Sequence, residues 1–502
     1  MSLFSETVQL IHKNAQLIDN PSFEELRKLS KKENPKKTKY GSLIYLTKLK
    51  GRSVKSTEII ENEPTQEQIK LINEVAQYLK GKTLLKLDRK MGLTKPFYCR
   101  AYISEKYPHI GYLWAKMLFD SSPKQSPDFV SVQIPEWPET KILVDPKSGI
   151  TFILGSDYTG ELKKANLRLA MYQTKKSGGL GLHAGSKVLK ALNSEGNLIE
   201  KGVLIFGLSA TGKTTLTCHS HWLDKEKGEG TIIRQDDVVL MQQDSHCLGT
   251  EDNFYIKTDS LEPADQPILW KAAKSKNTLL ENVAVTTSGE VDFFDTSLTT
   301  NGRAVVLRSE MEDTDNSIDL AQTNTIIFLT RRNTIIPPVA KLNNEQAAAF
   351  FMLGESMGSA ASDVSPGKPR RVVGTNPFII GSESEEGNRF YKIISKNPHL
   401  DCYFLNTGSL GAGGNAKPEK ITVHDSATII KEIARGNVKW KKDPDWGYEI
   451  LDELPGVDVP KFHPENFYSK ERYSKLTKEL KKERKEWLAK FPKLNPKISG
   501  AI

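Results

Sequence analysis

The chain has 502 residues, of which 38% are hydrophobic and 26% are charged. This length predicts two or more domains with large cores, and the composition is typical of a globular protein in water. No apolar run is long enough to span a membrane and no signal-peptide pattern opens the chain, so we expect a cytoplasmic protein without membrane contact. The four cysteines are scattered, which predicts reduced thiols.

The formal net charge of +9 is compatible with nucleic acid or with an anionic small substrate. Many lysines stand in local runs without interleaved aromatic residues, and no nucleic-acid-binding module is recognisable. Solvated surface is therefore the better interpretation of those runs, and we expect no nucleic-acid partner.

The first 160 residues predict helices followed by a sheet. Residues 1–40 indicate helices with a lysine-rich connection, and Gly51-Arg52-Ser53 alone is weak evidence for anything beyond a surface turn. Thr65 and Gln68 form a capping-box pattern before an amphipathic helix that ends near Gly81. Short apolar runs between 127 and 154 alternate with Pro, Asp and Gly, which predicts strands of a mixed or antiparallel sheet.

A strand-to-helix turn follows at Tyr158, and it carries the adjacent lysines Lys163 and Lys164. We expect both lysines in the first helical turn, where cations oppose the helix dipole. That placement favours an anion or metal site over a purely structural role. His183 closes a glycine-rich run and, taken alone, is more often a structural histidine than a ligand.

The strongest local pattern begins after the apolar run 203–206, which predicts a buried strand. The nine residues that follow form a glycine-bounded loop: Gly207, Leu208, Ser209, Ala210, Thr211, Gly212, Lys213, Thr214 and Thr215. Strand, loop and a helix beginning near Leu216 are typical of a P-loop, whose backbone N–H groups bind phosphate oxygens. Lys213 supplies charge at the outer phosphates, and the Thr214 hydroxyl suits Mg²⁺.

Asp236 and Asp237 end a predicted strand at 231–235. In P-loop enzymes an acid at the end of a neighbouring strand holds the metal on the nucleotide, so this pair fits a metal site. Two exposed carboxylates in a turn would be the preferred interpretation without the P-loop upstream.

The remaining chain predicts strands near 280–285, 291–294, 304–307, 325–330 and 403–405, and a capped helix at 347–353. Residues 354–375 lack apolar periodicity, so we expect a mobile loop there, a candidate lid. Residues 469–490 predict a charged helix that ends before Pro492.

The order of these motifs resembles that of the ATP-type phosphoenolpyruvate carboxykinases. The resemblance runs from about residue 40 to about residue 470 and includes the Gly51, Tyr158, His183, P-loop and Asp236 segments, Asn253 to Thr258, Leu280 to Val283 and Asn301-Gly302-Arg303. It implies a two-domain α/β fold with the P-loop in the C-terminal domain and the active site in the cleft between domains. We expect residues 1–185 to form the substrate domain and residues 186–502 the nucleotide domain.

The resemblance also implies a reaction and its residues. Oxaloacetate and ATP would give phosphoenolpyruvate, CO₂ and ADP, with two divalent metals, in gluconeogenesis. By position, Lys164, His183 and Asp237 resemble ligands of a Mn²⁺-type ion, and Thr214 resembles the Mg²⁺ ligand. The expected substrate and phosphoryl contacts are Arg52, Tyr158, Lys163, Ser209, Lys213 and Arg303. The expected nucleotide contacts include the P-loop, Asp236, Glu281, Arg303, Lys420 and Ser426.

The residue chemistry agrees with this resemblance. Arg52 and Arg303 can grip carboxylate or phosphate oxygens bidentately, as a dicarboxylate substrate requires. Decarboxylation leaves an enolate whose charge a metal can stabilise. A lysine ligates metal only when deprotonated, so Lys164 would need a lowered pKa, which Lys163 and the metal both favour.

The chain departs from the family at Ala210, Gly302, Lys420 and the lid segment 360–373. Ala210 replaces a glycine and would crowd the phosphates if its φ is positive. Gly302 replaces the usual threonine, and Lys420 replaces an arginine and loses its planar fork.

Two alternatives stay open, one suggested by the altered lid and the other only by the net charge of +9. The first is a related P-loop small-molecule kinase acting on a different acidic substrate. The second is a non-catalytic or nucleic-acid-linked P-loop protein. ATP rather than GTP rests on the resemblance alone, and we expect a monomer.

Overall fold

The computed structural model describes residues 2–121, 126–208, 210–358 and 367–502. Within these ranges the chain forms two compact units. Unit 1 comprises 1–173, 250–263 and 269–311, and unit 2 comprises 174–249, 264–268 and 312–502. The fold class is mixed α/β, as the sequence predicted.

The division of the chain is more interleaved than one boundary near residue 185. Most of the segment 250–311 returns to unit 1, where its strand β18 (Leu279–Glu281) pairs with β3 (Leu43–Tyr45) near the N-terminal end of the chain. That pairing joins residues more than 230 positions apart, so no local pattern in the sequence could reveal it.

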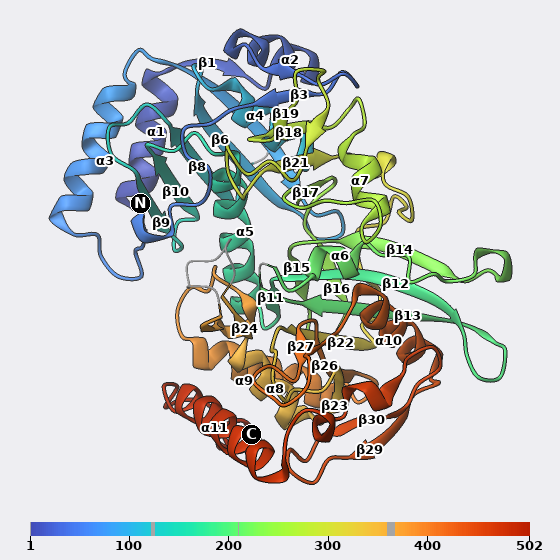
Figure 1. The fold of residues 1–502 in the computed structure, drawn as a ribbon. Coiled ribbons are helices and arrows are strands. Elements are labelled where there is room, and N and C mark those ends of the chain that lie inside the picture. The colour runs from blue at the N-terminus through green and yellow to red at the C-terminus, as the bar shows by residue number, and fades with distance from the viewer. Residues whose placement is uncertain (1, 122–125, 209, 359–366) are drawn as a thin grey trace. The chain divides into compact units, whose positions relative to one another are not determined.

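The main sheet of unit 1 is mixed and is drawn in blue to teal in Figure 1. Its strand order is β1-β5-β6-β8-β10-β9-β4, with β7 paired to β5. Its strands are β1 (Gln16–Asp19), β4 (Thr57–Ile59), β5 (Thr83–Met91), β6 (Phe97–Ser104), β7 (Phe119–Asp120), β8 (Phe129–Ile134), β9 (Lys141–Asp145) and β10 (Ile150–Leu154). The predicted strands between 127 and 154 are thus confirmed as members of a mixed sheet.

Helices cover both faces of this sheet. The helices of this part of the chain are α1 (Leu3–Asn14), α2 (Phe23–Ser30), α3 (Gln66–Leu79), α4 (Pro108–Met117) and α5 (Thr159–Lys176). α1 and α3 lie side by side on one face, where Phe4, Ile72 and Val75 pack on Val132 and Phe152 (Figure 1). α3 has the predicted capping box of Thr65 and Gln68, which fixes its first turn.

A second sheet of unit 1 carries the strands that return from the middle of the chain. Its order is β17-β21-β18-β3-β2. The members beside β3 are β2 (Lys36–Lys37), β17 (Phe254–Lys257), β18 (Leu279–Glu281) and β21 (Arg303–Val306), and the hairpin β19 (Ala284–Val285) with β20 (Val291–Asp292) follows β18. Helix α7 (Pro267–Ala273) begins in a segment of unit 2 and ends in unit 1.

Unit 2 is organised by an eight-stranded sheet of order β14-β12-β13-β22-β26-β23-β30-β29. Its strands are β12 (Ala184–Leu192), β13 (Leu198–Phe206), β14 (Gly230–Gln235), β22 (Thr325–Thr330), β23 (Val339–Leu342), β26 (Asp401–Asn406), β29 (Lys439–Lys442) and β30 (Glu449–Glu453). β13, β22 and β26 are parallel, so their carboxyl ends lie at one edge. Ligands of open α/β sheets bind at such edges.

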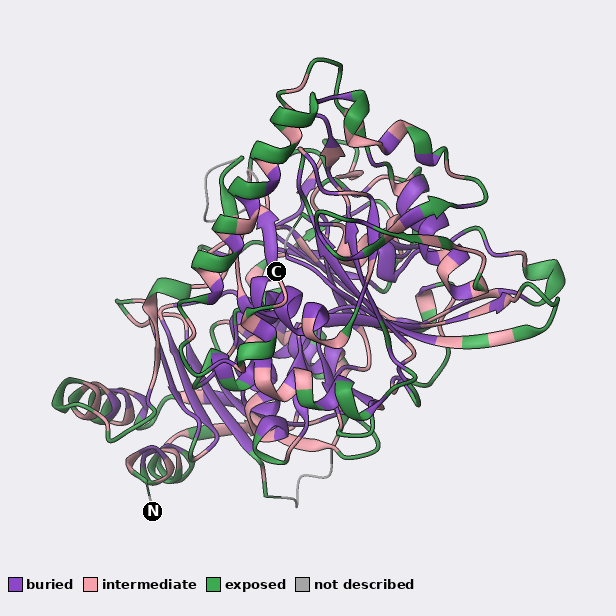
Figure 2. Ribbon diagram, turned by 90° about the horizontal axis from the view of Figure 1, so that it is seen from below, coloured by how far each residue is buried: buried purple, intermediate pink, exposed green. Residues whose placement is uncertain are grey.

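Alternate residues of β13 belong to two hydrophobic cores because successive side chains point to opposite faces. Leu204 and Phe206 pack with α8 (Asn344–Leu353), α9 (Glu383–Lys396), α11 (Lys470–Leu488) and α12 (Pro496–Ser499). Val203 and Ile205 pack with α6 (Lys213–Thr217) and α10 (Val423–Arg435). Figure 2 shows the strands as the buried part of the molecule and the outer helix faces as exposed.

Smaller elements complete the units. The remaining strands are β11 (Leu180–Leu182), β15 (Val239–Met241), β16 (Cys247–Gly249), β24 (Glu355–Met357), β25 (Pro369–Arg371), β27 (Ser409–Leu410) and β28 (Glu419–Lys420). Short 3-10 helices occur at Lys31–Glu33, Val54–Ser56, Lys225–Lys227, Arg308–Glu310, Val373–Thr375, Val459–Phe462 and Pro464–Asn466. Among the described residues, no helix is both long and apolar enough to cross a bilayer.

The candidate lid is partly regular. β24 and β25 pair as a hairpin within the predicted loop 354–375. Residues 359–366 of this loop lie outside the described residues. The predicted charged helix is α11, which Ser469 caps at its start. The mobility of the lid stays a prediction.

Candidate functional site

The glycine-bounded loop joins β13 to α6 at the carboxyl edge of the unit 2 sheet. Helix α6 begins at Lys213, three residues earlier than the sequence predicted, so Lys213 and Thr214 are its first residues. A Cβ at Gly207 would stand 2.4 Å from Thr211 Oγ1, and Gly212 has φ +91°. The close packing of the Thr211 side chain therefore favours glycine at 207, and the left-handed backbone favours glycine at 212.

Ala210 adopts φ +67°, which is in the left-handed region. The sequence raised this possibility because Ala210 replaces a glycine of the family. The loop around it is held by hydrogen bonds: Thr211 Oγ1 donates to the Leu208 carbonyl at 2.7 Å, and Thr407 Oγ1 donates to the Thr211 carbonyl at 2.8 Å. The neighbouring Ser209 lies outside the described residues.

A lysine, a histidine and an acid meet beside this loop within unit 2. Lys213 Nζ donates to the Asp236 carbonyl at 2.5 Å and lies 3.8 Å from Asp237 Oδ1. His183 Nε2 lies 3.1 Å from the same Asp237 oxygen, and His183 Nδ1 is 2.7 Å from the Thr375 carbonyl oxygen. The structure thus brings together three residues that the sequence places 54 positions apart at most.

The contacts of His183 fix its chemistry. A nitrogen 2.7 Å from a carbonyl oxygen must carry its proton, so Nδ1 is the donor and Nε2 faces Asp237. A neutral imidazole would then direct a lone pair at a carboxylate oxygen. That contact is favourable only when a proton or a cation lies at Nε2, which is the condition that a metal site satisfies.

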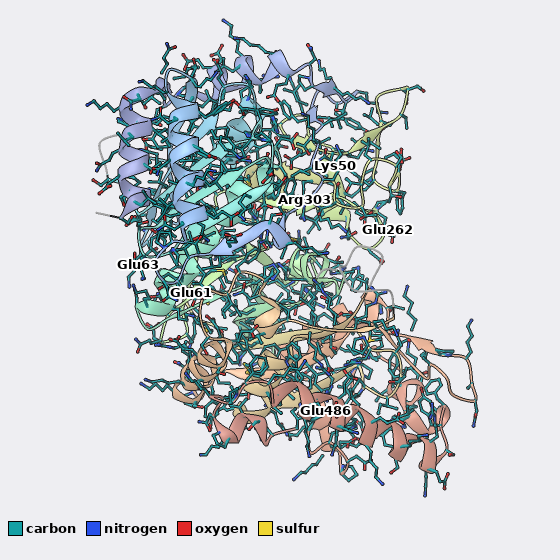
Figure 3. All side chains as sticks on the ribbon, turned by 90° about the vertical axis from the view of Figure 1, so that its left-hand side faces the viewer. Lys50, Glu61, Glu63, Glu262, Arg303 and Glu486 are labelled. Atoms are coloured by element: carbon teal, nitrogen blue, oxygen red, sulfur yellow. The ribbon has the colours of Figure 1, made fainter. Side chains whose placement is uncertain are left out.

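Unit 1 holds a second group of predicted residues. Arg303, the first residue of β21, donates from Nε to the Tyr158 hydroxyl at 3.1 Å and from Nη2 to Asn301 Oδ1 at 2.7 Å. Asn301 Nδ2 donates to the Lys50 carbonyl at 2.7 Å. Asn301 thus links Arg303 to Lys50, and both of these residues are labelled in Figure 3.

The two predicted lysines lie one turn further into helix α5 than expected. The helix begins at Thr159, so Lys163 and Lys164 belong to its second turn, and the argument from an opposed dipole was wrong for these positions. Lys163 is buried, 3.0 Å from Glu251 Oε2 and 5.3 Å from the Tyr255 ring centroid. Lys164 is half-buried on the same helix.

Arg168, one turn beyond Lys164, is a cation that sequence reasoning missed. Burial is the main cause that lowers its pKa to about 10, and the charge of Arg52 lowers it further. Arg52 is therefore close to α5. The backbone N–H of the next residue, Ser53, donates to the carboxylate of Glu161 on the same helix. The i, i+4 spacing of Lys164 and Arg168 was the available signal.

Glu281 is fully buried in unit 1. Its Oε1 accepts from the Thr159 N–H at 3.0 Å, which caps α5, and its Oε2 accepts from the Tyr255 hydroxyl at 2.6 Å. Burial, and then the charge of Glu281, hold the pKa of Tyr255 well above its ordinary value. The nucleotide contact predicted for Glu281 stays a prediction.

The other predicted nucleotide contacts lie in unit 2. Lys420 is exposed at the end of β28, Ser426 is buried in the first turn of α10, and the Thr215 hydroxyl accepts from Gln266 Nε2 at 3.0 Å. No cluster of three or more His, Cys, Asp or Glu side chains occurs within residues 2–121, 126–208, 210–358 and 367–502. Of the three ligands predicted for the Mn²⁺-type ion, only His183 and Asp237 are residues of those types, and the third is Lys164.

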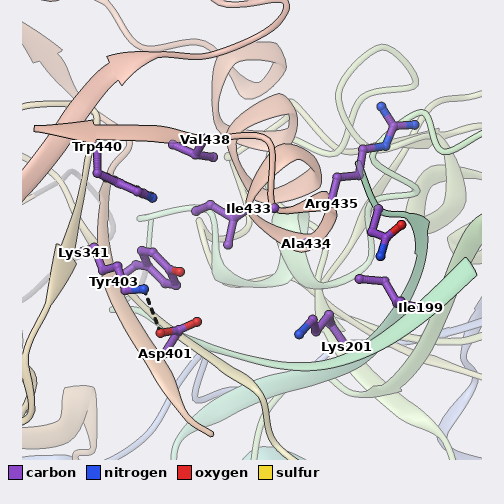
Figure 4. Close-up of a pocket in the computed structure, with 12 residues that line it drawn as sticks. Ile199, Lys201, Lys341, Asp401, Tyr403, Ile433, Ala434, Arg435, Val438 and Trp440 are labelled. Carbon is purple, nitrogen blue, oxygen red and sulfur yellow. Dashed lines mark ion pairs between the residues drawn. The ribbon is translucent and has the colours of Figure 1, made fainter. Parts of the chain in front are cut away.

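A cavity of about 380 Å³ opens at the other edge of the unit 2 sheet (Figure 4). It is lined by the early part of β13, the start of β26 and the end of α10, with an ion pair between Lys341 and Asp401 at 3.0 Å. Lys201 stands six residues before Gly207, about 20 Å along an extended strand. None of the predicted site residues lines this cavity, which is separate from the glycine-bounded loop.

A strand, a glycine-bounded loop and a helix that begins with lysine, at the carboxyl ends of parallel strands, are typical of the P-loop class of α/β proteins. A model of the family described as phosphoenolpyruvate carboxykinase matches residues 15–460. The chain belongs to this family.

Named relatives cover most of the chain. It is 35% identical over 429 residues to the phosphoenolpyruvate carboxykinase (ATP) of Aeropyrum pernix, an alignment covering 85% of each protein. Proteins of the same name in Staphylococcus aureus and Brucella melitensis are 28% and 29% identical over 449 and 350 residues. Those alignments cover 84% and 68% of this chain, and 80% and 62% of the two relatives.

Proposed function

We propose that this protein is an ATP-dependent carboxy-lyase that converts oxaloacetate and ATP to phosphoenolpyruvate, CO₂ and ADP. The observation that carries the proposal is the meeting of Lys213 and His183 at Asp237, beside the glycine-bounded loop. An ordinary small-molecule kinase needs the lysine and an acid, but it has no need of a histidine on the same carboxylate oxygen.

The loop and Lys213 bind the phosphates. Backbone N–H groups of the loop cradle the phosphate oxygens, and Lys213 offsets charge on the group being transferred. Its Nζ now donates to the Asp236 carbonyl, and a bound phosphate would compete with that oxygen for the ammonium. Ser209, Lys420 and Ser426 remain in the proposal as substrate or nucleotide contacts by position in the family.

The unit 1 residues bind the dicarboxylate. Arg303 is held by Tyr158 and Asn301, which fixes its planar fork for a carboxylate or phosphate. Arg52 and Lys163 add charge near α5. The loop residues of unit 2 and these unit 1 residues must act on the same enolate and ATP. We therefore propose the interdomain active site that the family implies.

The residues present fit the metals that the family implies. His183 and Asp237 converge on one point, and an imidazole with a carboxylate is a suitable donor set for a Mn²⁺-type ion. In the proposal Lys164, His183 and Asp237 hold that ion and Thr214 holds Mg²⁺. When bound, these ions supply Lewis-acid stabilisation of negative charge.

The reaction has two steps. First the bond between the β-carboxylate and its carbon breaks, CO₂ leaves, and the electron pair stays on the substrate as an enolate. The enolate oxygen then attacks the γ-phosphorus, and the bond to the ADP oxygen breaks. Arg303 and Tyr158 orient the substrate for the first step, and Lys213 offsets charge in the second.

A coupled assay tests the proposal. We expect phosphoenolpyruvate from oxaloacetate that depends on ATP and Mn²⁺, with less product when GTP replaces ATP. If the protein binds ATP tightly and forms no phosphoenolpyruvate, the carboxy-lyase proposal fails and a kinase with a different acidic substrate takes its place.

We also propose a cytoplasmic monomer. All four cysteines are buried and none forms a disulfide bond, as expected in a reducing compartment. Light scattering behind a sizing column would give about 56 kDa for a monomer, and twice that value would contradict it.

A further inference from the structure

Ala210 has a conformation that its own side chain disfavours. Its φ of +67° is in the left-handed region, which a residue with a Cβ rarely enters. Such a residue persists only where its surroundings hold it. Ala210 is also exposed and is part of the loop that the proposed function assigns to phosphate binding, so packing of its methyl group does not explain its conformation.

Besides the hydrogen bonds that Thr211 and Thr407 donate to carbonyls of the loop, one contact to Ala210 itself comes from a distant part of the chain. Arg331 follows strand β22 by one residue and donates from Nη1 to the Ala210 carbonyl at 2.8 Å. A hydrogen bond from a guanidinium to a carbonyl is charge-assisted and stronger than a neutral one. Together with the Thr211 N–H, which donates to the Leu208 carbonyl at 3.2 Å, it fixes the direction of the Ala210–Thr211 peptide.

The backbone beside Arg331 is itself fixed. The Arg332 N–H donates to Asn406 Oδ1 at 2.9 Å, and the Arg332 carbonyl accepts from the Ser409 N–H at 3.0 Å. The Arg332 side chain is buried and points into an ion-pair cluster: its Nη2 lies 3.1 Å from Glu355 Oε2 and 2.8 Å from Glu483 Oε1.

The cluster is anchored by helix α11. Arg484, fully buried, donates to both Glu355 oxygens at 2.5 and 3.1 Å, and Arg371 lies 2.9 Å from Glu355. Despite the opposing effect of burial, the arginines hold the pKa of Glu355 well below its usual range, with Arg484 contributing most. α11 lies beyond residue 460, where the family match ends.

We propose that Arg331 is a positioning residue for the phosphate-binding loop, and that helix α11 supports it through Glu483 and Arg332. Arg331 stabilises the left-handed Ala210 so that the loop is already in its phosphate-binding shape before nucleotide arrives. The identity of the ligand, ATP, rests on the proposed function. The positioning role of Arg331 rests on the geometry of the loop.

A double-mutant cycle tests the first part. We expect Arg331→Ala to raise the calorimetric Kd for ATP about tenfold, which equals about 1.4 kcal/mol. It should raise KM for ATP similarly while leaving KM for oxaloacetate unchanged. Because glycine adopts positive φ freely, Arg331→Ala should lose much less affinity in an Ala210→Gly background.

Each other outcome of the cycle overturns the proposal. An equal tenfold loss in both backgrounds would make Arg331 a direct ligand of the phosphates. Unchanged ATP affinity would make it a surface residue, like the matched control Arg472→Ala on α11, which is also exposed. Equal losses for ATP and oxaloacetate would indicate a general structural effect.

Hydrogen exchange of the ligand-free protein separates this inference from the proposed function. We expect Arg331→Ala to speed amide exchange in the peptide covering 207–215, whatever reaction the protein catalyses. Unchanged exchange there would overturn the inference, whereas a lack of phosphoenolpyruvate formation would overturn only the function.

A conservative change on α11 tests the second part. Glu483→Gln removes one charge from the contact with Arg332 and keeps the side chain's shape, and we expect a two- to threefold rise in Kd for ATP. Glu486→Gln, an exposed position on the same helix, is the control and should change nothing. If Glu483→Gln also changes nothing, α11 does not support Arg331.

Discussion

His183 is the residue whose role the structure sharpened most. Its Nδ1 is committed to the Thr375 carbonyl, and its Nε2 faces Asp237. In the proposed function His183 holds a metal ion, so we expect His183→Asn to lower kcat at least about 100-fold, more than the tenfold to hundredfold effect of a residue that only orients a metal ligand. The Kd for ATP, measured by calorimetry, should stay within about twofold.

The control for this variant is His246→Asn, which removes a histidine paired to Asp244 at 2.6 Å on the surface. It should leave both constants unchanged. Near-normal turnover of His183→Asn would mean that the metal assignment is wrong.

Gly302 stands where the family usually has threonine, and the neighbouring Thr258 leaves little room for a side chain there. A Cβ there would stand 2.6 Å from Thr258 Oγ1 and 3.2 Å from the Asn282 carbonyl. We therefore expect Gly302→Thr, the usual residue of the family, to lower the free energy of unfolding by about 1–3 kcal/mol through overpacking. It should also lower activity, because Arg303 and Asn301 flank it.

Urea unfolding measures the stability effect of Gly302→Thr. Gly230→Ala is the matched control, since a Cβ there meets nothing within 4 Å. A fully stable and active Gly302→Thr would contradict the tight packing at this turn.

At the scale of elements, Lys187 on β12 carries a buried charge against the end of α6. Its ammonium donates to the Leu216 and His219 carbonyls and contacts His221. Burial is the main cause that lowers its pKa to about 7. The charge of Lys187, after burial, lowers the pKa of His219 to about 4 and that of His221 well below its usual value.

The sign of the pH effect follows from proton binding. Below pH 7 the folded and unfolded states both carry the Lys187 charge, so the cost of burying it is present in full. Between pH 7 and 10.5 only the unfolded state keeps the proton, so the free energy of unfolding rises with pH, by about 1 kcal/mol per pH unit.

Lys187→Met removes this rise. We expect the stability of the variant relative to wild type to fall as pH increases from 7 to 9, as measured by urea unfolding at each pH. Lys190→Met, on the same strand but partly exposed, should give a curve parallel to wild type. Parallel curves for Lys187→Met would mean that Lys187 is not neutralised in the folded state.

Local patterns predicted the elements that local chemistry determines. The capping box at Thr65, the capped helix predicted at 347–353 and the strand before Gly207 are present as expected, because each depends on residues within a few positions. Strand β1 was missed, because its four residues are stabilised by pairing with β5 rather than by a pattern of their own.

The roles of the predicted site residues stay predictions, but the structure shows which of those residues lie together and which contacts were missed. Lys213, Asp237 and His183 meet as the family order implied. Arg331 was missed, because its contact with Ala210 joins residues 121 positions apart. The burial of Glu281 was missed as well, because nothing in its sequence neighbourhood shows that Thr159 and Tyr255 surround it.

At the scale of the whole molecule, the family match leaves the C-terminal helix unexplained. Residues 461–502 lie beyond the matched span, yet Leu480, Leu488, Leu494 and Ile498 belong to the main core of unit 2. A surface appendage would contribute no fully buried side chains to that core. We therefore regard the C-terminal segment as an integral part of unit 2 rather than as an addition to it.

Leu488→Ala tests that view directly. Leu488 is 1% exposed on α11, and truncating a buried leucine costs about 2–5 kcal/mol through lost burial and a residual cavity. We expect a fall of that size in the free energy of unfolding measured in urea. Glu486→Ala, labelled in Figure 3 and exposed on the same helix, should change it by less than about 0.5 kcal/mol. If both variants unfold at the wild-type urea concentration, α11 is only loosely docked, and the support it gives to Arg332 and Arg331 would be lost with it.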